Sequence, residues 1–302
     1  MTSSNPHNSK ADICCIGHIT LDRVITPRFT ANMPGGTAYY FAKALRNFPH
    51  DGFRLVTSVG APESGVADEL RSDGIDVTVI PSRKSVFFEN KYGADMNHRT
   101  QRVLAKADPF TVENLSDVEA KVFHLGTLLA DDFDLAIIRD LAGRGDVSVD
   151  VQGYLRKVVG DQVADVDYEL KHEALPYIGI LKANEREMEV LTGESDARRA
   201  ARILSGWGCR EVLLTLGDKG SLIHVGGKFY EIPAIAAPEL VDATGCGDTY
   251  MAGYLHMRNR GASYTEAGTF AAAMCTVKLG CKGPFSGTEE DVLRLLQSHK
   301  NA

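Results

Sequence analysis

The chain has 302 residues, of which 44% are hydrophobic and 24% are charged, as is ordinary for a globular protein with its own core. Its net charge of −7 and its lack of long Lys/Arg clusters argue against a nucleic-acid or membrane partner. No apolar run is long enough to span a bilayer, and six cysteines without C-x-x-C spacing point away from zinc sites and secreted disulfide frameworks. We therefore expect a cytoplasmic protein.

Strand-like and helix-like segments alternate along most of the chain. Apolar, β-branched-rich runs are predicted to be strands at 12–19, 55–60, 121–126, 147–151, 178–183, 211–216, 222–225 and 228–233. Amphipathic segments are predicted to be helices at 37–47, 64–72, 132–142, 185–191, 196–207, 248–257, 265–278 and 289–299. This alternation predicts an α/β fold in which helices cover both faces of a mostly parallel sheet.

One stretch breaks the alternation. Between residues 76 and 92 two strand-like runs, VTVIPS and SVFFENKY, follow each other without a helix, so they cannot form a β-α-β unit. We predict a small sheet that covers a site as a lid, formed by 23–31 and 76–109, with a simple edge hairpin as the alternative. The core of the single domain, 11–302, is then formed by 11–22, 32–75 and 110–302, and the polar residues 1–10 are expected to be a disordered tail.

The segment VDATGCGDTYMAGYL, residues 241–255, places glycines and a carboxylate where a helix is predicted to begin. The first N–H groups of a helix lack partners and carry partial positive charge, and glycines let an anion approach them. Gly245, Cys246 and Gly247 are therefore predicted to bind a phosphate or a transferring phosphoryl group. Asp248 fits two roles that do not exclude each other, a helix N-cap and a general base for an attacking hydroxyl.

The presence and absence of other motifs exclude several classes of enzyme. No P-loop, G-x-S-x-G or H-E-x-x-H motif occurs, and Tyr250 stands where a dinucleotide-binding fingerprint needs a small residue. The run from Asp242 to Asp248 resembles the D-x-x-G-x-G-D signature of the ribokinase-like (PfkB) family of carbohydrate kinases, and other landmarks appear in the family's order over nearly the whole chain. The resemblance implies a ribokinase-like three-layer α/β/α fold with a small β-sheet lid. It also implies that ATP phosphorylates a hydroxyl of a small sugar or cyclitol, with Asp248 as the base.

The same resemblance implies an acceptor site. Asp22, in IGHITLD, stands where relatives have an acid that binds sugar hydroxyls, and Gly35 and Gly36, in PGGTAYYFAKAL, stand where relatives contact the substrate through the backbone. Gln152 follows a predicted strand, and ligands of open α/β sheets bind outside the carboxyl ends of strands. Gln152 is therefore a candidate acceptor contact, although a bond to a neighbouring loop would explain it equally well.

Cofactor contacts are implied in the second half of the chain. The N-x-x-E motif of Asn184 and Glu187 resembles the one that positions Mg²⁺ in relatives through water molecules, since the cation keeps most of its own water shell. Asp242 is implied as a ligand of a monovalent cation, K⁺. The residues implied to lie near ATP are Lys182, Thr215, Gly217, Gly220 and Thr276. Without the family, Lys182 would be read as a solvated strand end and Thr276 as part of a core helix.

The sequence leaves more than one class of phosphoryl acceptor possible. Tyr39 and Tyr40 depart from the G-G-K-G-A-N of ribokinase-type proteins, while G-G-x-A together with RVLAKADPF and DVQGYLR resembles the branch that includes myo-inositol kinases. A nucleoside kinase and a catalytically silent sugar-binding protein of the same fold are the alternatives. We also expect a homodimer formed through the apolar lid strand VFFENKY, with a monomer that has a shorter lid as the alternative.

Overall fold

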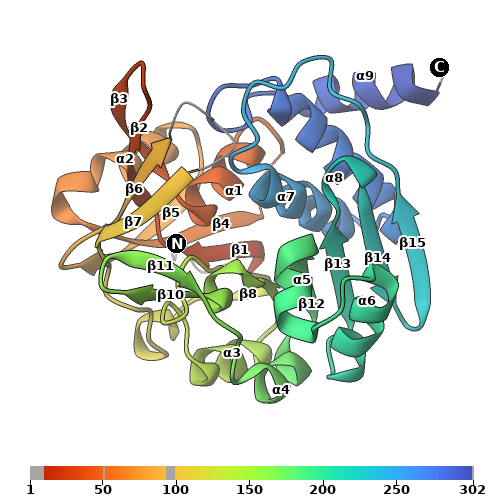
Figure 1. Ribbon diagram of the computed structural model, residues 1–302, viewed down its shortest axis with the longest axis horizontal. Helices are drawn as coiled ribbons and strands as arrows, with labels where there is room; N and C mark the ends of the chain where they lie inside the picture. Colours follow the sequence, from red (N-terminus) through yellow and green to blue (C-terminus); the bar gives the residue numbers. More distant parts are fainter. Residues whose placement is uncertain (1–9, 50–51, 93–98, 301–302) are drawn as a thin grey trace, which may run out of the picture.

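The computed structural model describes residues 10–49, 52–92 and 99–300 (Figure 1). Apart from Lys10, the predicted tail at 1–10 lies outside the described residues. In the part of the chain that the structure describes, no helix has the length and apolar character needed to cross a membrane.

The large sheet confirms the predicted α/β class. Within the described residues it has nine strands. Their spatial order is β15 (Lys228–Ile232), β14 (Ser221–Val225), β13 (Glu211–Thr215), β12 (Ile180–Asn184), β9 (Asp146–Asp150), β8 (Ala120–Gly126), β1 (Ala11–Gly17), β4 (Phe53–Gly60) and β5 (Asp76–Ser82). Neighbours from β13 to β5 pair in parallel, whereas β14 and β15 add an antiparallel edge.

Helices cover both faces of this sheet and form two separate cores. One core includes side chains of α3 (Leu135–Ala142), α4 (Lys171–Ala174), α5 (Glu185–Thr192) and α6 (Ala197–Gly206). The other includes side chains of α1 (Thr37–Leu45), α2 (Gly65–Ser72), α7 (Cys246–Asn259), α8 (Tyr264–Leu279) and α9 (Glu289–Lys300). The central strands are buried on both faces, as is typical of parallel sheets.

A second, smaller sheet lies where the lid is predicted, and it is called the lid below. Its strands are, in spatial order, β10 (Arg156–Val159), β11 (Gln162–Asp165), β7 (Arg99–Ala105), β6 (Val86–Tyr92), β2 (Thr20–Ile25) and β3 (Thr30–Gly35). In Figure 1 the hairpin of β2 and β3 projects from the body, and β6 and β7 lie beside it. Apolar side chains of β6 and β7 pack with Leu128 and Leu129 of the core.

The lid differs from the prediction in three places. Residues 20–22 and 32–35 were assigned to the core but belong to β2 and β3 of this sheet. Strand β5 was predicted to belong to it, but β5 pairs in parallel with β4, because helix α2 between them completes a β-α-β unit. The alternation therefore breaks after β5 and not before it. The hairpin of β10 and β11 was assigned to the core, yet it extends the lid through a pairing of Gln162 with Arg102.

The carboxyl ends of the parallel strands position the site. Strand β9 ends at Asp150, β12 at Asn184 and β13 at Thr215, so these side chains emerge at one edge of the sheet. Helices α1 and α7 begin at Thr37 and Cys246, and their first residues line the same region as those strand ends. Open α/β sheets bind ligands at this edge.

Candidate active site

A cavity of about 980 Å³ lies at this edge, and Asp248 lines it. Asp248 is in the first turn of α7 and is only 9% exposed. Burial, followed by the charge of Asp150, raises the pKa of the Asp248 carboxyl to about 7. A carboxyl group with that pKa is largely ionised just above neutral pH and can then accept a proton.

The segment that leads into α7 and includes its first residues lets other groups approach its backbone closely. Its residues, 242–248, are called the anion turn below. Gly245 is the N-cap, in the left-handed region with φ 79°, so Asp248 is not the N-cap. A Cβ on Gly245 would lie 2.3 Å from the Tyr40 ring, which packs directly against the turn. The Cys246 amide donates to the Ala243 carbonyl oxygen at 3.2 Å, which leaves the first-turn amides of Gly247 and Asp248 as the better anion donors.

Replacing Gly245 tests this turn. Gly245→Ala should lower kcat on the order of 10²-fold, because both the positive φ and the Tyr40 ring oppose a Cβ and displace the amide donors. Gly261→Ala is the matched control, since Gly261 has φ 82° but no atom within 4 Å of its added Cβ. Steady-state kinetics and urea unfolding check both variants. Equal kcat values for the two variants would contradict a role for the turn in turnover.

Lys182 places a buried positive charge beside the anion turn. Its Nζ donates to Asp150 Oδ2 at 2.8 Å, and both side chains are almost fully buried. A Cβ on Gly247 would lie 2.8 Å from the same Nζ. Burial opposes the charge of Lys182, but Asp150 and Glu187 outweigh it and raise the pKa of the ammonium above its usual range. Lys182 is thus a fixed cation next to the amides and not a solvated strand end.

Asn184 and Glu187 join the end of β12 to the start of α5. The Asn184 side chain accepts from the Glu187 amide at 2.9 Å, and the Glu187 carboxylate accepts from the Asn184 amide and side chain, each at 2.8 Å. This is a capping box, and it fixes both side chains. Both residues line the cavity, and burial raises the pKa of Glu187.

The predicted nucleotide residues line the other part of the cavity. Thr215, Gly217, Gly220 and Thr276 all contribute to its wall. Gly220 has φ 90°, and a Cβ there would lie 2.0 Å from the Ile232 carbonyl oxygen, so this turn requires glycine. The Thr276 hydroxyl donates a hydrogen bond to the Ile235 carbonyl oxygen at 2.8 Å, so its proton is already engaged within the protein. The wall here also has an apolar stretch, formed by Ala234, Ile235, Ala236, Ala237, Leu240, Ala272 and Leu279.

The predicted acceptor residues meet near α1. A Cβ on Gly35 would lie 2.5 Å from Asp22 Oδ2, so the Asp22 carboxylate lies directly against the Gly35 backbone. Gly36 is the N-cap of α1 with φ 88°. Asp22 itself stands on lid strand β2, opposite Met33.

Thr37 connects this acceptor side to Asp248, and the sequence reasoning missed it. Its hydroxyl hydrogen-bonds to the Asp248 carboxylate and accepts from Gln152 Nε2 at 2.9 Å. Gln152 also donates to the Thr127 carbonyl oxygen at 3.2 Å, so its NH₂ group is held by the fold while the residue lines the cavity. Asp150 and Arg156, two further charged residues of the wall, were also missed. The only signal for Asp150 was its place at a strand end, two residues before Gln152.

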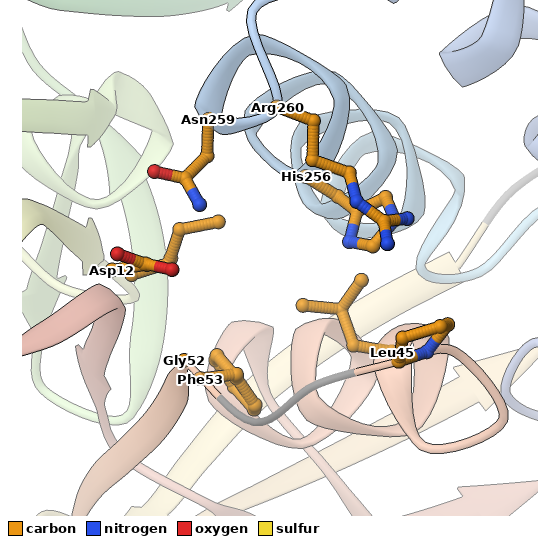
Figure 2. Close-up of a pocket in the computed structure, with 9 residues that line it drawn as sticks. Asp12, Leu45, Gly52, Phe53, His256, Asn259 and Arg260 are labelled. Carbon is orange, nitrogen blue, oxygen red and sulfur yellow. The ribbon is translucent and has the colours of Figure 1, made fainter.

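A smaller hollow of about 200 Å³ lies at the opposite edge of the sheet, near the start of β1 and the end of α7 (Figure 2). Asp12 and Asn259 face each other there, and His256 and Arg260 lie beside them. Burial lowers the pKa of His256 to about 4. None of the predicted site residues contributes to this hollow.

Comparisons with known proteins agree with this arrangement. The family model described as pfkB family carbohydrate kinase matches residues 10–291. A cytidine kinase of Thermococcus kodakarensis is 30% identical over 270 residues, which cover 84% of this chain and 91% of that protein. A nucleoside kinase of Methanocaldococcus jannaschii is 24% identical over 95% of this chain and 97% of that protein.

Solved structures show the same fold. A pyrophosphate-dependent kinase in the ribokinase family, complexed with a pyrophosphate analog and myo-inositol, has a TM-score of 0.81 and 27% identity, covering 93% of this chain and 99% of that one. A ribokinase of Arabidopsis thaliana, complexed with ribose and ATP, has a TM-score of 0.78 and 21% identity, covering 96% and 99%. The chain therefore belongs to the PfkB family of carbohydrate kinases and is a sugar or nucleoside kinase with the ribokinase-like fold.

Proposed function

We propose that this protein transfers the γ-phosphoryl group of ATP to a hydroxyl of a small sugar or cyclitol, with Asp248 as the general base. The observation that carries the proposal is the position of Asp248. Its buried carboxylate faces the cavity, carries a pKa of about 7 and hydrogen-bonds to Thr37, next to the predicted acceptor residues. The intact catalytic set, Asp248, Gly245, Gly247, Asn184 and Glu187, also supports an enzyme over a catalytically silent sugar-binding protein.

The proposed reaction is a direct in-line transfer. The attacking hydroxyl gives its proton to an Asp248 carboxylate oxygen as its own oxygen bonds to the γ-phosphorus, and the bond from that phosphorus to the β–γ bridging oxygen breaks, which releases ADP. The amides of Gly247 and Asp248 and the Lys182 ammonium stabilise the negative charge on the transferring group. The Thr37 hydroxyl holds the base in place. Closure of the lid would exclude water.

The cavity favours ATP over pyrophosphate as the donor. Pyrophosphate has only polar groups to bind, whereas the wall of this cavity also includes the apolar side chains of Ile235, Leu240 and Leu279. An adenine ring buries apolar surface in such a place, as small-molecule sites usually do. We therefore propose that Thr215, Gly217, Gly220 and Thr276 lie along the nucleotide.

The residues fit Mg²⁺ but not K⁺. Among the described residues no group of three or more His, Cys, Asp or Glu side chains could hold a metal directly. Asn184 and Glu187 present hard oxygen atoms at the cavity, which suits outer-sphere binding of a hydrated Mg²⁺ that neutralises phosphate charge. Asp242, the implied K⁺ ligand, instead receives a hydrogen bond on its carbonyl oxygen from the buried Lys278 ammonium.

Two classes of acceptor, cyclitols and nucleosides, are each supported by a relative of this chain. A cyclitol is supported by the 27% identity to the kinase that was solved with myo-inositol. A nucleoside is the second candidate, because the cytidine kinase of Thermococcus kodakarensis is 30% identical over most of both chains. The homodimer through the lid and the cytoplasmic location stay predictions.

A matrix of donors and acceptors tests the proposal. ATP and pyrophosphate would each be combined with cyclitols, pentoses, hexoses and nucleosides, and the phosphorylated product would be identified by mass spectrometry. We expect an acceptor-dependent product with ATP, formed from a sugar or cyclitol. Turnover with pyrophosphate but not ATP would contradict the donor, and a product from nucleosides alone would replace the acceptor class. The absence of any product would contradict the kinase mechanism.

A further inference from the structure

Lys278 places a second buried ammonium at the anion turn. It lies in the last turn of α8 and is 0% exposed. Its Nζ donates to the Asp242 carbonyl oxygen at 2.6 Å and lies 3.8 Å from Asp242 Oδ2. A buried ammonium is costly unless oxygen atoms surround it, so this contact fixes where the positive charge lies.

Asp242 ties the ammonium to two loops. Its Oδ1 accepts from the Thr244 amide at 2.9 Å, inside the anion turn. Its Oδ2 accepts from the Gly283 amide at 3.1 Å, in the loop that follows α8. The carbonyl and the carboxylate of Asp242 thus converge on one cation, three residues before Gly245. These are the oxygen atoms that a monovalent cation would need at this position.

We propose that the Lys278 ammonium serves as a built-in monovalent cation, which holds the anion turn in its binding conformation and removes any requirement for K⁺. The inference rests on the proposed kinase function and names Lys278 as a positioning residue. An ammonium group and K⁺ have the same charge and similar size, and both bind oxygen atoms. With Lys278 in place, the Asp242 carbonyl is already occupied.

The comparison with Lys43 separates this role from an ordinary buried lysine. Lys43 is 2% exposed, and its Nζ donates to Glu69 and Asp73, each at 2.6 Å. Those partners are surface carboxylates on and after α2, and none of the three residues lines the cavity. Lys43 therefore stabilises the fold, whereas Lys278 contacts the turn that carries the catalytic base.

The first arm of the test uses the wild-type protein. Turnover would be measured with ATP as its Tris salt in buffers free of K⁺ and Na⁺, and again with added KCl or with choline chloride at equal ionic strength. We expect the same kcat and KM in all three conditions. Activation by KCl but not by choline chloride would overturn the proposal.

The second arm removes the ammonium. Lys278→Ala should lower kcat on the order of 10²-fold, with a smaller change in KM, and KCl or ethylammonium should restore much of it, because the cavity left by the side chain admits a cation. Lys278→Met fills that cavity and should not be rescued. Lys43→Met, the matched control, should lose stability and keep kcat without any response to K⁺. A kcat for Lys278→Ala near the wild-type value in the absence of added cations would overturn the proposal.

A measurement of thermal stability, which does not depend on turnover, tests the role of Lys278 separately from the proposed kinase function. The thermal unfolding midpoint of Lys278→Ala should rise with KCl and not with choline chloride, while those of the wild type and Lys278→Met should respond equally to both salts. If no acceptor is phosphorylated by the wild type in any salt, the kinase proposal fails, and this selective stabilisation still decides the role of Lys278. Equal responses of Lys278→Ala to both salts would overturn it.

Discussion

Asp248→Asn should lower kcat by about 10²–10⁴-fold and leave ATP binding close to the wild-type value. The variant keeps the shape of the side chain but removes the group that accepts the hydroxyl proton. Isothermal titration calorimetry with ATP and steady-state kinetics check the two parts. Glu211→Gln is the control, because Glu211 is also a buried carboxyl with a burial-raised pKa, but it lies at the opposite end of β13. Its kcat should not change. Near wild-type turnover by Asp248→Asn would contradict the assignment of the base.

The same variant should be more stable than the wild type at alkaline pH. The pKa of Asp248 is about 7 in the folded protein and near 3.8 when unfolded, so the folded state holds an extra proton between these values. The wild-type unfolding free energy therefore falls as pH rises through this window, by an upper limit of roughly 4 kcal/mol from this group. Urea unfolding at about pH 5 and pH 8 should show the advantage of Asp248→Asn growing with pH. A pH-independent difference would contradict the raised pKa.

Lys182→Met should damage both stability and turnover. It leaves Asp150 buried without its partner, which should cost about 3–5 kcal/mol of unfolding free energy. It also removes the cation beside Gly247, which should lower kcat on the order of 10²-fold or more. Urea unfolding and steady-state kinetics measure the two effects.

A double variant separates the two effects. Lys182→Met combined with Asp150→Asn removes both charges and should recover much of the lost stability, because no unpaired charge remains at the pair. Turnover should stay low, since the positive charge next to the transferring group is still missing. Recovery of turnover together with stability would show that Lys182 acts only through the fold.

The local patterns of the sequence predict much of this enzyme. The strand and helix alternation predicts the parallel sheet, and the signature from Asp242 to Asp248 predicts the helix start at which Asp248, the proposed base, lies. The breaker residues Gly245 and Gly220 both have positive φ, as turns of this kind require. The capping box of Asn184 and Glu187 was not predicted, because the N-x-x-E motif was interpreted only as a motif that positions Mg²⁺.

The missed features depend on contacts between distant segments. Thr37 reaches Gln152 across 115 positions of the sequence, and Lys182 reaches Asp150 across 32. No local pattern indicates either pair. Strand β5 was assigned to the wrong sheet because sheet membership depends on its partner β4 and not on its own residues. Lys278 was not singled out from the sequence, and its buried contact with Asp242 shows where its charge lies.

The pH dependence of kcat/KM for the acceptor, at saturating ATP, tests most directly whether Asp248 is the catalytic base. The carboxyl must be ionised to accept a proton, so kcat/KM should rise with pH, following one ionisation near the pKa of about 7, and should level off above it. Asp248→Glu, which retains a carboxylate, should keep a rising profile at a lower rate. A kcat/KM that is flat from about pH 5 to pH 9 in the wild type would contradict the mechanism.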